Sequence, residues 1–140
     1  MNPTVLLSAD SRSTAGVLLL TIVAIEYGGW FMLRVVRGRQ PATPFQQAFF
    51  RAGHAHAGVL VILSLVCMIY VDATQASGLL AVLARNGVPA AAILMSAGFF
   101  LSAAGRGATQ PNRFVVLLYA GIVSLALGVT SLGASLLIGG

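Results

Sequence analysis

Charged side chains are scarce in this sequence. Only 8% of the 140 residues are charged, whereas about 25% are charged in an average soluble domain, and 58% are hydrophobic. With a mean hydropathy of +0.93, the chain has too little charge to cover a surface that faces water. This composition excludes an ordinary water-soluble enzyme, a nucleic-acid-binding protein and a disordered chain, and it indicates a protein embedded in the lipid bilayer.

Lysine is absent, and acidic residues and cysteine are rare. The eight basic residues are all arginine, and against three acidic residues they give a net charge of +5. In a membrane protein such an excess sets the topology and contacts lipid headgroups, so it does not indicate a nucleic-acid partner. The single cysteine, Cys67, cannot form an intrachain disulfide.

Long apolar stretches account for nearly the whole chain. Because about 20 apolar residues cross a bilayer as a helix, the pattern predicts an all-α integral membrane protein with four transmembrane helices in an antiparallel bundle. The expected spans are roughly 15–34, 52–70, 79–104 and 114–138, within a single membrane domain over residues 1–140. The first stretch is too long for a signal peptide and no cleavage site follows it, so we expect it to remain as a span.

Two details of these spans depend on local signals. Ser13 and Thr14 precede the first apolar run and are candidate N-cap residues. In the third stretch, the polar segment Arg85-Asn86-Gly87 and then Pro89 interrupt the apolar pattern. We favour one long helix with a possible kink at Pro89, and a separate short interfacial helix before Pro89 is the alternative.

The arginines predict the orientation. Six of them lie in or beside the first and third connecting loops: Arg34, Arg37, Arg39, Arg51, Arg106 and Arg113. Arg12 and Arg85 belong to the other side of a four-span protein. The positive-inside rule therefore predicts that loops one and three are cytoplasmic and that both termini lie outside.

The only two histidines, His54 and His56, lie at the beginning of the second span. Residues two apart on a helix point about 200° away from each other, so these two are not expected to chelate one metal ion together. The small residues around them leave space for a flat macrocycle or a neighbouring helix. Haem iron is commonly held by one axial histidine in an apolar pocket. We therefore favour a haem or metal site, and interfacial histidines bonded to a carbonyl or headgroup are the alternative.

Soft ligands for copper are present but scattered. Met32, Met68, Met95 and Cys67 supply sulfur, but no Met-x-Met or Cys-x-x-Cys spacing gathers them. Packing is the simpler interpretation of these residues, and a copper site is a minor alternative.

Glu26 is an acidic residue inside the first span. An acid near the bilayer centre costs roughly 2.5–3.5 kcal/mol on insertion scales, so it is expected to be paired, protonated or facing a wet cavity. It is either a pocket acid that partners a histidine or arginine, or a structural residue bonded between helices. Beside it, Tyr27 and Trp30 are belt residues or pocket walls.

Rows of small residues with a spacing of four predict close helix packing. They comprise Gly53 with Ala57, Gly98 with Ser102, and Ala120 with Ser124 and Gly128. The sequence leaves open whether these rows pack within one protomer or between protomers.

Four short segments together resemble the styrene oxide isomerases, small four-span bacterial membrane enzymes. These segments are Tyr27 to Met32, Arg51 to Gly58, Gly98-Phe99-Phe100 and Gln110-Pro111-Asn112. They resemble the end of that family's first span, its Arg-Ala-His-Ser-Gly segment, its Gly-Phe-Tyr and its Gly-Pro-Asn. Their order and spacing, rather than any single motif, carry the resemblance.

The resemblance implies a homotrimer in a bacterial-type inner membrane, with haem b near the protomer interfaces. It implies one axial histidine, for which His56, followed by Ala57-Gly58, is the better match and His54 the fallback. Ferric haem then acts as a Lewis acid that opens a small hydrophobic epoxide to an aldehyde. The family's active-site tyrosine and asparagine, which orient the epoxide beside the cofactor, fall at Phe100 and Ile62.

This departure leaves two functional hypotheses open. The first is a haem-b-binding protein that is still an epoxide isomerase, with Glu26, Tyr27 or Ser64 replacing the missing polar groups and Glu26 and Tyr27 as the catalytic candidates. The second is an accessory membrane subunit that binds haem without catalysis or has no cofactor.

Overall fold

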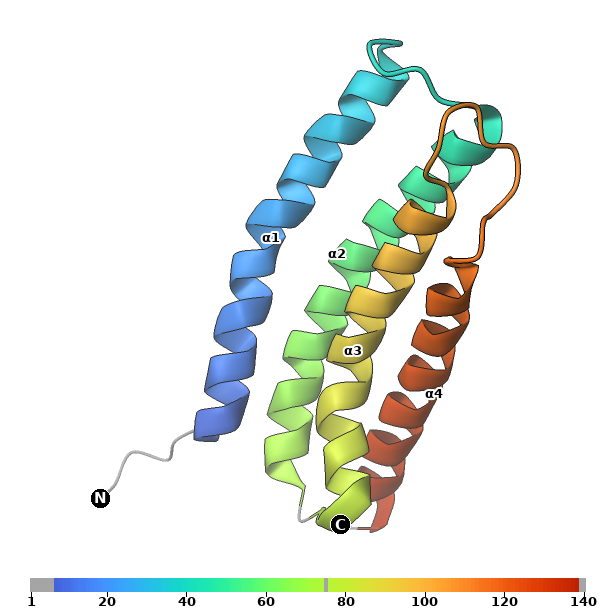
Figure 1. The fold of residues 1–140 in the computed structure, drawn as a ribbon. Coiled ribbons are helices and arrows are strands. Elements are labelled where there is room, and N and C mark those ends of the chain that lie inside the picture. The colour runs from blue at the N-terminus through green and yellow to red at the C-terminus, as the bar shows by residue number, and fades with distance from the viewer. Residues whose placement is uncertain (1–6, 75, 139–140) are drawn as a thin grey trace.

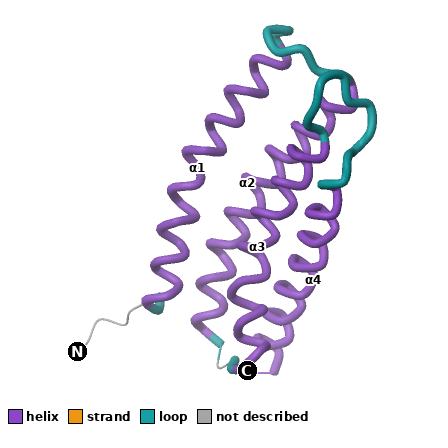
Figure 2. The backbone as a smooth tube through the Cα atoms, viewed as in Figure 1, coloured by secondary structure: helices purple, strands orange, loops and turns teal. Residues whose placement is uncertain are grey.

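A computed structural model describes residues 7–74 and 76–138, which fold into four helices (Figure 1). The helices are α1 (Ala9–Val36), α2 (Pro44–Ala73), α3 (Gly78–Ser102) and α4 (Val115–Ile138). Each is long and apolar enough to cross a membrane, and no strand occurs in the described residues (Figure 2). The predicted fold class, an all-α membrane protein with four transmembrane helices in a bundle, is confirmed.

The helices lie side by side in the order α1, α2, α3, α4 (Figure 1). The most extensive contact is between α3 and α4, followed by α2 with α3, while α1 packs mainly against α2. Helix α1 therefore stands at the edge of the bundle. It does not pack closely against α3, and side chains line the space between these two helices.

Helix α1 begins earlier than the sequence suggested. Its N-cap is Ser8, whose hydroxyl accepts a hydrogen bond from the backbone N–H of Ser11 at 3.2 Å. The expectation of a cap at Ser13 or Thr14 was wrong, because both lie inside the helix. The error has a physical reason: hydropathy marks where apolar residues begin, whereas a cap is set by a side chain that satisfies the first free N–H groups.

A capping box begins helix α2, eight residues before the apolar span predicted at 52. The Thr43 hydroxyl accepts from the Gln46 N–H at 3.2 Å, and the Gln46 side chain accepts from the Thr43 N–H at 3.1 Å. Pro44 occupies the first turn, where its missing N–H costs nothing. The two histidines therefore lie about three turns into a continuous helix rather than at its end.

Helix α3 runs without a break through Pro89, and no separate short helix precedes that proline. Glycines bring α3 and α4 together. A Cβ added to Gly87 would lie 2.5 Å from the Cα of Gly128, and Ser124 donates a hydrogen bond to the Gly87 carbonyl at 2.9 Å. A Cβ on Gly98 would lie 2.5 Å from the backbone nitrogen of Leu118. These glycines thus pack the helices of one protomer against each other.

Loops one and three lie together at one end of the bundle (Figure 1). The Gln46 side-chain amide donates to the carbonyls of Ala103 at 2.9 Å and Gly105 at 2.8 Å, and Thr43 donates to the Ala108 carbonyl. The two arginine-rich loops therefore lie at the same end of the bundle and are bonded to each other.

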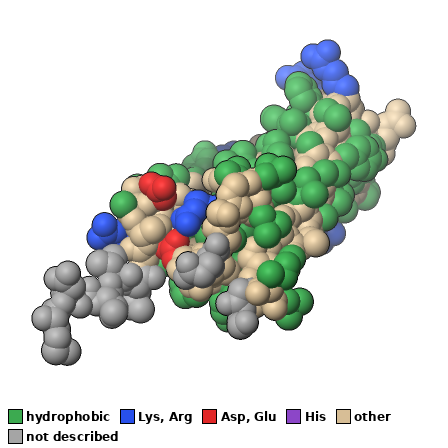
Figure 3. Space-filling view, turned by 90° about the horizontal axis from the view of Figure 1, so that it is seen from below, with side chains coloured by type: hydrophobic (Ala, Val, Ile, Leu, Met, Phe, Trp, Pro, Cys, Tyr) green, Lys and Arg blue, Asp and Glu red, His purple; other side chains and the backbone are tan. Residues whose placement is uncertain are grey.

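An ion pair joins three helices at the opposite end. Arg85 on α3 lies 2.9 Å from the Asp72 carboxylate on α2 and donates to Ser11 on α1. The backbone N–H of Ser8 also donates to Asp72 at 2.7 Å. Figure 3 shows basic and acidic side chains side by side at this end, with hydrophobic side chains along the flank.

Candidate functional site

His56 is held in a fixed orientation on α2. Its Nδ1 lies 2.7 Å from the carbonyl oxygen of Ala52, one turn earlier in the helix. A carbonyl oxygen only accepts, so Nδ1 carries the proton and, in the neutral ring, Nε2 keeps its lone pair. The ring also packs on Phe99 of α3, with the ring centroids 5.0 Å apart. This arrangement leaves one imidazole nitrogen available to a metal, because ligating histidines usually anchor the other nitrogen in this way.

The outward surface of α2 near His56 is apolar and open in the protomer. His56 itself is half-buried, whereas the side chains of Val59 and Ile62 are 64% and 61% exposed. These exposed side chains and the His56–Phe99 contact lie on an open face of the protomer. A site at this face needs another molecule to enclose it.

His54 contacts a different helix. A Cβ added to Gly28 would lie 3.3 Å from Nδ1 of His54, and one added to Gly29 would lie 3.4 Å from its Cε1. The glycine pair on α1 thus makes room for this imidazole. His54 therefore meets α1, whereas His56 meets α3, so the two rings point to different neighbouring helices.

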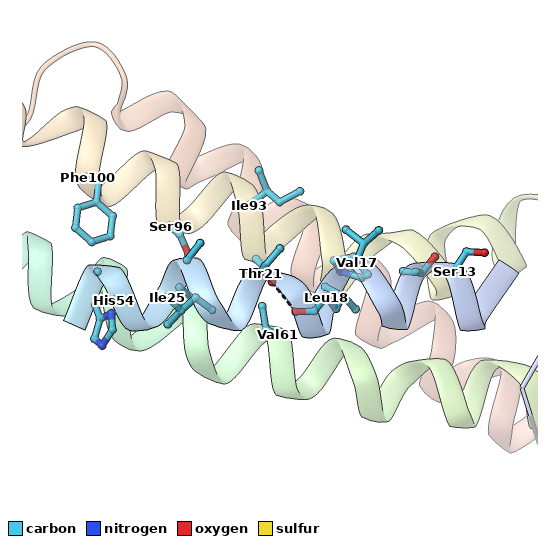
Figure 4. Close-up of a pocket in the computed structure, with 16 residues that line it drawn as sticks. Ser13, Val17, Leu18, Thr21, Ile25, His54, Val61, Ile93, Ser96 and Phe100 are labelled. Atoms are coloured by element: carbon cyan, nitrogen blue, oxygen red, sulfur yellow. Dashed lines mark hydrogen bonds between the residues drawn. The ribbon is translucent and has the colours of Figure 1, made fainter. Parts of the chain in front are cut away.

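A cavity of about 560 Å³ lies between α1, α2 and α3 (Figure 4). Its walls are mainly aliphatic, and His54, Phe100 and Ser96 lie among its lining residues. The hydroxyl oxygen of Ser96 is buried and has no hydrogen-bond partner in the described residues. An apolar cavity with a few polar groups is the usual form of a small-molecule site.

Phe100 and Ile62 are not brought together. Phe100 lines the cavity and stacks on Phe50 of α2, with centroids 5.7 Å apart and the rings inclined by 18°. Gly53 permits this contact, since a Cβ there would lie 2.9 Å from the Phe100 ring. Ile62 lies outside the cavity on the exposed surface of α2. Within the protomer the two positions therefore do not form one pocket.

Glu26 and Tyr27 lie on the outer surface of α1. Glu26 is exposed, and no hydrogen bond or ion pair involves its carboxylate in the described part of the chain. Tyr27 is 69% exposed and packs on Trp30 with centroids 5.5 Å apart, while the Arg34 guanidinium lies 5.0 Å from the Trp30 ring. Neither catalytic candidate lines the cavity, and their roles remain predictions.

Hydrophobic packing accounts for Cys67 and Met95, and a hydrogen bond within its own helix accounts for Ser64. Cys67 and Met95 are buried in two different hydrophobic clusters, and Ser64 donates to the Leu60 carbonyl of its own helix at 2.7 Å. Among residues 7–74 and 76–138, no three His, Cys, Asp or Glu side chains gather as a metal site.

The cavity and Ser96 were missed by sequence reasoning. Ser96 and Phe100 are four residues apart on α3 and therefore share one face of that helix. A polar residue on the same face as Phe100 was the signal that could have indicated this site. No protein-family model, curated protein or solved structure matches the chain. The site is thus defined by its geometry: an anchored histidine on the surface of α2 and an apolar cavity on the α1 side.

Proposed function

We propose that this multi-pass membrane protein binds haem b, with His56 as the axial ligand and His54 as the fallback. The observation that supports it best is the hydrogen bond from His56 Nδ1 to the Ala52 carbonyl at 2.7 Å. It leaves Nε2 with a lone pair and fixes the plane of the ring, which is the usual preparation of a histidine ligand.

The residues present fit one half of a haem site. A haem brings four nitrogen atoms of its own, so the protein has to supply only one ligand and an apolar surface. His56 with Phe99, Val59 and Ile62 provides that ligand and that surface on one side. When bound, the iron would supply a Lewis acid or an electron carrier at this surface.

A second copy of the chain is the natural source of the other wall. The resemblance implies a trimer, and the exposed carboxylate of Glu26 within a span supports association. An unpaired acid that faces lipid is costly, and a neighbouring protomer would cover it. We therefore propose a homo-oligomer, with three copies as the expected number.

The reaction implied by the resemblance is isomerisation of a small hydrophobic epoxide to an aldehyde. Phe100 and Ile62 have no hydroxyl or amide to orient the epoxide, and exposed Tyr27 and Glu26 could take that role only across a protomer interface. Formation of phenylacetaldehyde from styrene oxide by haem-loaded protein tests the reaction. If none of several aryl and alkyl epoxides yields an aldehyde, the alternative of a non-catalytic haem-binding subunit replaces it.

The proposed location is a bacterial-type inner membrane, with loops one and three in the cytoplasm and both termini outside. Six of the eight arginines lie in or beside loops one and three, which is the distribution that the positive-inside rule relates to the cytoplasm.

The first experiment is an absorption spectrum of the purified protein, oxidised and then reduced. A Soret band with b-type features supports haem binding, and the shift on reduction distinguishes one axial ligand from two. A colourless preparation from haem-replete cells would overturn the proposal and favour a cofactor-free accessory subunit.

A further inference from the structure

The cavity between α1, α2 and α3 contains a polar group that the fold leaves without a partner. Two buried serines in other helices bond within their own helix: Ser64 donates to the Leu60 carbonyl at 2.7 Å and Ser135 donates to the Ser131 carbonyl at 2.8 Å. Ser96 makes no such bond, although its oxygen is fully buried. An unmade hydrogen bond in an apolar site is unfavourable, so a ligand atom that completes it gains affinity.

The cavity also opens on the apolar flank of the bundle, the part of the surface that a bilayer would cover. Val17 on α1 and Ile93 on α3 both line it, and they are 64% and 71% exposed on the outer surface of the helices. Figure 4 shows both residues with Ser96 between Ile93 and Phe100 along the same groove. A molecule that enters between Val17 and Ile93 comes from the hydrocarbon region and is therefore lipophilic.

Size and wall chemistry define the occupant. The volume of about 560 Å³ lies within the range of about 300–1,000 Å³ for small-molecule sites. We infer that the cavity binds a small, mainly apolar molecule with one hydrogen-bonding oxygen, such as a medium-chain alcohol or ketone, and that Ser96 bonds that oxygen. A plain acyl chain fills the volume but offers nothing to the Ser96 hydroxyl. This site is independent of haem binding at His56, which lies against α3 outside the cavity.

Photolabelling of protein in phosphatidylcholine vesicles tests the inference. The probes are an aliphatic diazirine with a terminal hydroxyl and the same diazirine without it. We expect the hydroxylated probe to label residues around Val17, Ile25 and Ile93, with saturation and with displacement by 1-octanol. Ser96→Ala is expected to weaken its binding about fivefold, the effect of one neutral hydrogen bond, and to leave the hydrocarbon probe unaffected.

Matched variants separate the cavity from general effects. Ser135→Ala removes a buried serine hydroxyl that bonds within its own helix and should change neither probe. Ile93→Trp fills the mouth of the cavity and should abolish labelling by both probes, whereas Ile69→Trp, at a 59% exposed position outside the cavity, should not. Ile93→Trp also tests the inference if Ser96→Ala does not accumulate.

Two results would overturn the inference. Equal labelling by both probes with no effect of Ser96→Ala would identify a slot for acyl chains only, and labelling that is unsaturable or lies elsewhere would exclude the site. Because His56→Ala is expected to leave labelling unchanged, a failure of haem binding and a failure of this inference are distinguishable.

Discussion

His56 Nδ1 lies 2.7 Å from the carbonyl oxygen of Ala52, whereas His54, two residues earlier, has no hydrogen-bond partner in the described residues and lies against Gly28 and Gly29 of α1. The two histidines of the chain are therefore prepared differently. His56 has an anchored ring with one free nitrogen at an apolar surface. His54 is packed between two helices beside a cavity. This difference gives the first prediction.

We predict that His56→Ala lowers the haem content by roughly tenfold or more, because it removes the imidazole whose Nδ1 is anchored to the Ala52 carbonyl. His54→Ala is expected to retain the Soret band. The measurement is the ratio of Soret to protein absorbance after purification from haem-supplemented cells. The opposite pattern would move the ligand to His54 and the cofactor to the cavity side of α2.

The crossing of α3 and α4 gives a prediction on stability. Gly87→Ala places a methyl group 2.5 Å from the Cα of Gly128, and such overpacking against backbone costs about 1–3 kcal/mol. Gly133→Ala on α4 is the control, because nothing lies within 4 Å of its added Cβ. Thermal unfolding in detergent should show a lower midpoint for Gly87→Ala and an equal or higher one for Gly133→Ala. Equal midpoints would mean that the two helices separate easily here.

The ion pair at the other end of the bundle is expected to fix helix α1. Arg85→Ala removes the hydrogen bonds to Asp72 and Ser11 and leaves a carboxylate with 9% exposure without its counterion. We expect a loss of about 1–2 kcal/mol, reduced from the value for a buried pair because Arg85 is 26% exposed. Hydrogen exchange should rise in the first turns of α1. The exposed Arg12, on the same end of α1, is the control, and an equal effect of Arg12→Ala would show that only net charge matters.

The spans were predictable because hydropathy alone decides which segments the bilayer accepts. Their ends were not, since Ser8 and Thr43 cap their helices through local hydrogen bonds in polar segments that hydropathy ignores. The helix period correctly separated His54 from His56. The helix period could not reveal the cavity, because the cavity forms only where α1 packs against α2 and stays apart from α3. In the sequence Ser96 is one of several serines within the spans, and only the helix arrangement shows that its buried hydroxyl has no hydrogen-bond partner in the described residues.

The carboxylate of Glu26 gives a prediction on assembly. If a neighbouring protomer covers it, Glu26→Leu removes an interhelical hydrogen bond worth about 1–2 kcal/mol and should shift the oligomer towards the monomer. Light scattering of the protein in detergent measures the shift. Val23→Leu, at a 67% exposed apolar position on α1, is the control. An unchanged oligomer with Glu26→Leu would place this acid outside the interface.

The topology prediction can be tested by labelling introduced cysteines, because the chain has one cysteine of its own. Cys67 is 4% exposed, so it should give little background with a membrane-impermeant maleimide. Ser77→Cys and Thr109→Cys place an accessible thiol at opposite ends of the bundle, at exposed loop positions without side-chain hydrogen bonds. Because loops one and three carry most arginines, Thr109→Cys should react only after the membrane is permeabilised, whereas Ser77→Cys should react in intact spheroplasts. The reverse pattern would show the opposite orientation, with the Asp72–Arg85 end in the cytoplasm.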